Sequence, residues 1–171
     1  MKIISVSIAL VFALINFLVP VTVMSAEKLE IEHPIKSPQK YTDKEKCDNC
    51  GMDRNKWART RHEFQNSKGS FHTCSMHCAA VLSMKTKDAP KDVKVAEYLK
   101  PENMLDAERA FYVVGSTAPG TMSPISKVAF PTKEEAEKFS SKYGGTVMNF
   151  EGALNAAKTG VEKQNRHEHK H

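Results

Sequence analysis

Cys47-Asp-Asn-Cys50-Gly-Met52 is one of two short stretches that together hold all four cysteines of this 171-residue chain. The other is His72-Thr-Cys74-Ser-Met-His-Cys78. Two residues separate the first pair of cysteines, so one backbone turn can present both sulfurs to one ion, and the second pair has the spacing of one helical turn. Thiolates and thioethers select soft ions such as Cu(I) and Zn(II) over Mg(II) and Ca(II). The pattern predicts a metal site.

The chain begins with Met1-Lys2, an apolar run over residues 3–23, and the small residues Ser25 and Ala26. These features are typical of a secretory signal peptide, and we expect cleavage after Ala26; the alternative is an uncleaved segment that anchors the protein in the membrane. Removing residues 1–26 from 171 leaves 145 residues, and the loss of Lys2 lowers the formal charge from +5 to +4. Charges of both signs are interspersed, without a basic run among aromatic residues, which argues against nucleic-acid binding. The sequence therefore predicts an exported protein.

Export makes disulfides the alternative to a metal site, because four cysteines outside the cytoplasm commonly form two disulfides. A bond between Cys74 and Cys78 would constrain little, since both lie at the start of one predicted helix. The pairing left open joins Cys47 or Cys50 to Cys74 or Cys78. Disulfides do not require neighbouring histidines and methionines, and this favours the metal. The same geometry would also hold a metal ion when the cysteines are reduced.

The rest of the chain predicts short strands and helices after a polar arm at residues 27–45. Periodicity predicts strands at 58–64 and 70–73 and a helix at 75–85. The second half predicts, in order, strands at 93–99, 110–114 and 127–130, a helix from a capping box at Thr132 to residue 143, a strand at 146–150 and a helix at 151–158. We therefore predict an α+β fold of two small strand-strand-helix units packed together, about 46–90 and 91–158, and a polar, His-rich tail at 159–171.

A set of short motifs runs from Cys47 to about Leu154. Leu105-Asp-Ala-Glu-Arg-Ala-Phe-Tyr-Val-Val-Gly-Ser116 is followed by Gly120-Thr-Met122 and by Val128-Ala-Phe130. Residues 136–139, Tyr143-Gly-Gly-Thr-Val147 and Cys50-Gly-Met52 belong to the same set. Together these motifs resemble the NosL family of nitrous oxide reductase accessory proteins. The spacing of Cys50, Cys74 and Cys78 also resembles a TRASH-type metal knuckle.

The resemblance implies two small α+β units and a periplasmic Cu(I) chaperone. Such a protein takes copper from a donor and delivers it to a copper enzyme such as nitrous oxide reductase. The family's Cys-Gly-Met cysteine maps onto Cys50, and the methionine of its Gly-Pro-Met-Gly loop maps onto Met122. The family is typically lipid-anchored through a cysteine at the cleavage site, where this chain has Glu27. That difference argues against a membrane anchor.

We therefore expect a Cu(I) carrier without enzymatic activity, since no Ser/His/Asp constellation, phosphate loop or paired acid and base carboxylates stand out. Cys50 and Met122 are expected as the primary ligands, with a second ring or second site formed by Cys47, Met52, His72, Cys74 and Cys78. One alternative is a structural zinc knuckle that acts in assembly or interaction, with a closed site of four thiolates or of three thiolates and His77, in which Met122 has no role. Another is a thiol–disulfide protein that uses Cys47 and Cys50, although the βαβ context of such sites is missing.

Overall fold

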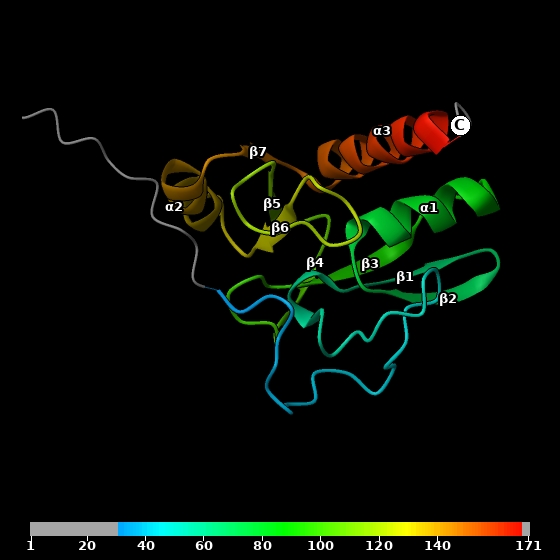
Figure 1. Ribbon diagram of the computed structural model, residues 1–171, viewed down its shortest axis with the longest axis horizontal. Helices are drawn as coiled ribbons and strands as arrows, with labels where there is room; N and C mark the ends of the chain where they lie inside the picture. Colours follow the sequence, from blue (N-terminus) through cyan, green and yellow to red (C-terminus); the bar gives the residue numbers. More distant parts are fainter. Residues whose placement is uncertain (1–30, 169–171) are drawn as a thin grey trace, which may run out of the picture.

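The computed structural model describes residues 31–168, with side chains described as far as Arg166. This part of the chain forms two antiparallel sheets and three α-helices (Figure 1). The predicted signal peptide and its cleavage site after Ala26 lie outside the described residues. The α+β prediction is confirmed.

The first sheet carries the metal-site segments. Its strands are β1 (His62–Asn66), β2 (Gly69–Thr73), β3 (Lys91–Ala96) and β4 (Met104–Asp106), in the order β2-β1-β3-β4. Residues 58–60, predicted as the start of a strand, form the short 3-10 helix η1 (Ala58–Thr60) instead. The boundary predicted near residue 91 assigns β3 and β4 to the second unit, but both strands pair within the first sheet.

The second sheet is smaller and lies against its own helix. Its strands are β5 (Phe111–Val114), β6 (Lys127–Phe130) and β7 (Thr146–Met148), in the order β6-β5-β7. Helix α2 (Lys133–Tyr143) begins where the capping box predicts, because the Thr132 side chain accepts a hydrogen bond from the backbone N–H of Glu135 at 3.2 Å. The two sheets meet where Tyr98 N–H donates to the Ala129 carbonyl at 2.9 Å.

Helices α1 (Met76–Thr86) and α3 (Phe150–Glu168) pack side by side (Figure 1). A polar tail is predicted from residue 159, but α3 continues to Glu168, so this prediction is wrong for residues 159–168. Leu154, Ala157 and Val161 are buried at helical spacing, so the apolar stripe of α3 continues past the predicted helix end and packs in the main core. Within residues 31–168, no helix combines the length and apolar character needed to cross a membrane.

Hydrogen bonds from Arg54 hold the N-terminal arm against the first sheet. Its guanidinium is fully buried and donates to the Lys44 carbonyl at 2.6 Å, the Thr73 carbonyl at 3.2 Å and the Glu63 carboxylate at 2.9 Å. A buried guanidinium needs such partners, because leaving its donors unpaired is costly. The arm, β1 and the end of β2 are thus held together immediately before the second cysteine pair.

The extension of α3 can be tested with two neighbouring substitutions. Val161→Ser should lower the free energy of unfolding by about 2 kcal/mol, because Val161 is buried in the core. Glu162→Ser is the matched control, since Glu162 is exposed and should change stability by less than about 0.5 kcal/mol. Urea unfolding of both variants gives the comparison. Equal, small effects would contradict the packing of this turn of α3.

Candidate metal centre

The first cysteine pair lies on a tight turn that closes on itself. Gly51 N–H donates to the Cys47 carbonyl at 2.8 Å, and Cys47 N–H donates to the Met52 carbonyl at 3.0 Å. Gly51 has a φ of 73°, a left-handed conformation that favours glycine. Asp48 N–H donates to the His72 carbonyl at 2.9 Å, so the turn is attached to β2. This attachment brings Cys47 and Cys50 to the second cysteine pair.

The second pair lies where β2 ends and α1 begins. Ser75 caps the helix, because its hydroxyl accepts a hydrogen bond from Cys78 N–H at 3.3 Å. Cys74 and Cys78 are therefore one helical turn apart, with Cys78 in the first turn of α1. The N-terminal end of a helix carries free N–H groups and a partial positive charge, which would favour thiolates there once a metal ion has displaced their protons.

The four sulfurs converge within 4.8 Å of one another. Cys50 Sγ lies 3.6 Å from Cys74 Sγ and 3.7 Å from Cys78 Sγ, and the last two are 3.7 Å apart. All four cysteines are free thiols. Cys47, Cys74 and Cys78 are buried, whereas Cys50 is partly exposed. The centre is closed except at Cys50.

These separations suit a tetrahedral ion bound by sulfur. Zinc–sulfur bonds of about 2.3 Å in a regular tetrahedron would place the sulfurs about 3.8 Å apart. A disulfide would need a sulfur–sulfur distance of about 2.05 Å. The distances of 3.6 to 3.7 Å between the sulfurs of Cys50, Cys74 and Cys78 match the tetrahedral edge far better. The geometry can accommodate either Zn(II) or Cu(I), since both accept thiolate ligands.

The pKa values of the cysteines shift in opposite directions. Hydrogen bonds from Cys74 and Cys78 lower the pKa of Cys47 far below the usual range of a thiol. The hydrogen bond with Cys47 is also the largest cause that raises the pKa of Cys74, and burial raises that pKa further. These hydrogen bonds therefore favour negative charge at Cys47 and a proton on Cys74 when no cation is present. A bound metal ion would replace such protons.

Met52 and His72 flank the four sulfurs in different ways. Met52 and Trp57 pack against the cysteine cluster. The His72 ring lies beside the Asp48 carboxylate, with 3.5 Å between Nδ1 and Oδ2. Among the described residues, the group of converging His, Cys, Asp and Glu atoms contains the four cysteines and does not include His72. The structure therefore brings together four of the seven predicted ligands and places these two around them.

Met122, the seventh predicted ligand, lies on the loop between β5 and β6. It is 39% exposed and has a φ of 60°. Its side chain lines a pocket of about 410 Å³ together with His77 and Met84 of α1 and Val161 of α3. Positions 77 and 84 share a face of α1, while Cys78 lies on the neighbouring face. Met122 is thus placed beside the first turns of α1, on the His77 side.

Sequence reasoning missed three polar residues around the centre. Asn49 Nδ2 donates to Cys78 Sγ at 3.4 Å, and its position inside the Cys47–Cys50 turn is a signal that could have indicated this. The Thr60 hydroxyl donates to the Cys74 carbonyl at 2.8 Å and is hydrogen-bonded to the Thr121 hydroxyl at 3.0 Å. No local pattern marks either threonine, because these contacts join residues that are far apart in the chain.

Comparison with known proteins agrees with this fold. The NosL family matches residues 38–156. The copper-binding lipoprotein NosL of Stutzerimonas stutzeri is 25% identical over 134 residues, which cover 73% of this chain and 70% of the relative. The crystal structure of the copper chaperone NosL from Shewanella denitrificans has the same fold, with a TM-score of 0.53, 24% identity, and coverage of 69% of this chain and 96% of that one. The chain belongs to the NosL family.

Proposed function

We propose that this protein is an exported Cu(I) chaperone that carries copper in the four-sulfur centre. The observation that carries the proposal is the convergence of four sulfurs within 4.8 Å, closed except at Cys50. Thiolates bind Cu(I) strongly, and a partly exposed cysteine gives a recipient protein a place to begin ligand exchange. In this proposal Cys50 is a primary ligand and the entry point for exchange.

Met122 supplies the feature that distinguishes copper from zinc. A thioether is a ligand of Cu(I), whereas structural zinc sites use cysteine, histidine and carboxylates. Met122 is the exposed sulfur on a loop beside α1. We propose that it joins Cys50 on the ion, with Met52 and His72 in the surrounding ring. Cys47, Cys74 and Cys78 then form the buried wall of the site.

The proposed cellular role follows from the carrier chemistry. The chain would be exported by its N-terminal segment to the periplasm, receive Cu(I) from a donor and pass it to a copper enzyme such as nitrous oxide reductase. The relatives support this direction, since one is described as a copper-binding lipoprotein and one as a copper chaperone. A carrier needs no catalytic residues, and we propose no enzymatic activity.

A second function is favoured by one observation, the distances among the sulfurs of Cys50, Cys74 and Cys78, which lie near a tetrahedral edge. Four thiolates form a usual ligand set of a structural zinc site, with Cys47 as the fourth here. The ion would then fasten the Cys47–Cys50 turn to β2 and α1, and the protein would act in assembly or interaction.

Competition between metals separates the two functions. The reduced protein, challenged with equimolar Cu(I) and Zn(II), should retain one Cu(I) by elemental analysis. Cys50→Ser should weaken Cu(I) binding by about 100-fold or more, because it removes a ligand from a closed site. A tightly held Zn(II) that Cu(I) displaces only slowly, with unfolding on its removal, would instead establish the structural site.

Met122→Ala should weaken Cu(I) binding by about tenfold and leave Zn(II) binding unchanged, because it removes a thioether that zinc does not need. Ile125→Ala is the matched control, since Ile125 is an exposed apolar residue of the same loop. Chelator competition measures both affinities. Equal loss of both ions would rule out Met122 as the copper-selecting ligand.

The protonation of the cluster makes metal binding depend on pH. The raised pKa values of Cys74 and Cys78 mean that both thiols carry protons before the ion binds. Binding at neutral pH should therefore release at least these two protons, and affinity should fall by about 100-fold for each unit by which pH is lowered. Calorimetry in buffers with different ionisation enthalpies counts the protons. Heats that do not depend on the buffer would contradict this protonation state.

A further inference from the structure

The methionine loop, defined here as residues 120–125, contains one residue that points the opposite way from its neighbour. Thr121 is only 6% exposed, while Met122 is 39% exposed. A threonine between a glycine and an exposed methionine would ordinarily face water. Its burial therefore calls for a partner inside the protein.

The partners form a continuous chain of hydrogen bonds. Thr121 Oγ1 lies 2.8 Å from His33 Nε2 and 3.0 Å from Thr60 Oγ1. The Thr60 hydroxyl in turn donates to the backbone carbonyl of Cys74 at 2.8 Å. Thr60 is 3% exposed, so the chain lies largely out of water, where each hydrogen bond is stronger and each missing one more costly. The methionine loop is connected directly to the backbone of a cysteine of the metal centre.

The backbone on either side of Thr121 is equally constrained. Met122 has a left-handed φ of 60°, a conformation that an ordinary L-residue adopts at an energetic cost. At Gly120, a Cβ atom would lie 1.9 Å from the Ser123 carbonyl oxygen, so only glycine fits this turn. The surrounding contacts must therefore hold Met122 in its position at the apex.

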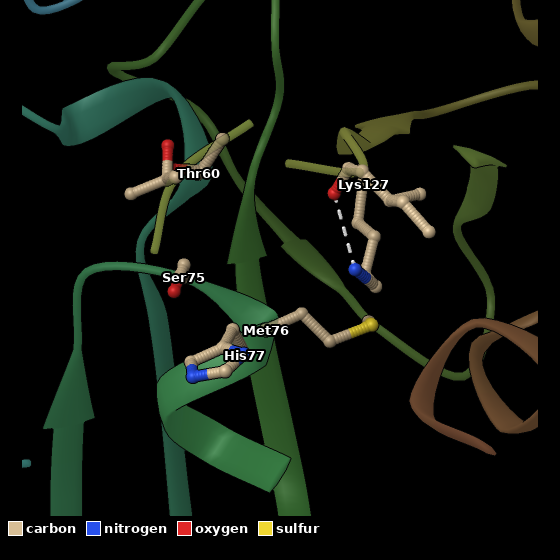
Figure 2. Close-up of a pocket in the computed structure, with 7 residues that line it drawn as sticks. Thr60, Ser75, Met76, His77 and Lys127 are labelled. Atoms are coloured by element: carbon tan, nitrogen blue, oxygen red, sulfur yellow. Dashed lines mark hydrogen bonds between the residues drawn. The ribbon is translucent and has the colours of Figure 1, made fainter. Parts of the chain in front are cut away.

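The far side of the loop is held by Lys127. Its Nζ donates to Ser123 Oγ at 3.3 Å and to the Ile125 carbonyl at 3.1 Å. Figure 2 shows Lys127 across a small pocket from Thr60, with Ser75, Met76 and His77 of the start of α1 lining the same pocket. The loop is thus fixed on both flanks over the beginning of α1.

His33 brings the N-terminal arm into the same arrangement. Its ring packs edge-on against Trp57, with 4.8 Å between the ring centroids, and Trp57 packs against the cysteine cluster. Arm, loop and metal centre therefore meet at Thr121 and Thr60. Within Gly120-Thr-Met-Ser123, the hydrogen bonds of Thr121 tie the loop to both the arm and the residues before β1.

We propose that His33, Thr60 and Thr121 are positioning residues that hold Met122 at a fixed place relative to Cys74, and that they thereby set the preference of the centre for Cu(I) over Zn(II). This inference rests on the proposed role of Met122 as a copper ligand. The hydrogen-bond chain keeps the thioether pre-organised, so binding Cu(I) does not have to order the loop first. The affinity for Zn(II), which does not use the thioether, does not depend on these hydrogen bonds.

Thr121→Val tests the proposal, because valine keeps the shape of threonine and removes the hydroxyl. It should weaken Cu(I) binding by about five- to tenfold and leave Zn(II) binding unchanged, with Thr121→Ser restoring the Cu(I) affinity. Thr60→Val should act in the same direction, as should His33→Phe, which keeps a ring against Trp57. Thr117→Val is the matched control, since Thr117 is exposed and only its backbone N–H is hydrogen-bonded.

A double substitution distinguishes positioning from general stability. In a Met122→Ala background, Thr121→Val should cause no further loss of Cu(I) affinity, because the residue it positions is gone. Additive losses, or equal losses of Cu(I) and Zn(II) in the single variant, would overturn the proposal. A wild-type protein that does not retain Cu(I) against Zn(II) would instead overturn the proposed chaperone function, so the two failures are told apart by the wild-type measurement.

Discussion

Four sulfur atoms within 4.8 Å of one another place a strict electrostatic demand on the protein around them. Four thiolates this close would repel each other strongly, because three of the four side chains are buried and poorly screened by water. Either protons or a cation must lie among them. Hydrogen bonds that lower the pKa of Cys47 and raise the pKa of Cys74 favour one shared negative charge in the metal-free cluster.

The four sulfurs come from two separate segments of the chain, and much of the local structure holds these segments together. The Cys47–Cys50 turn has little regular structure of its own, so it depends on the contact of Asp48 with the His72 carbonyl and on the guanidinium of Arg54 beneath it. The second pair is fixed more firmly, because a strand ends and a capped helix begins there. A metal ion would add a further link between the Cys47–Cys50 turn and the start of α1.

The predictable parts of the molecule are those whose signals are local. Helices α1 and α2 were located within one residue, since Ser75 and Thr132 cap them and their patterns are short and complete. The three-residue strand β4 is too short to show an alternation of polar and apolar residues. The last turns of α3 were not predicted, because most residues after Lys158 are polar. The cysteines could be predicted as a set from two motifs. Thr60 and Thr121 could not, because their contact spans 61 residues and depends on the finished fold.

The contrast between local sequence signals and long-range contacts also bears on how this centre could favour copper. Four thiolates alone accept both Cu(I) and Zn(II), so the cysteines that sequence patterns reveal do little to discriminate between the two ions. Discrimination requires a ligand that only one ion accepts, held where it can reach the ion. In the proposed site Met122 would be such a ligand, and a residue with a left-handed backbone and an exposed side chain keeps its place only if its neighbours hold it there. Metal selectivity would therefore reside in the buried hydroxyls beside Met122 as much as in the sulfurs themselves.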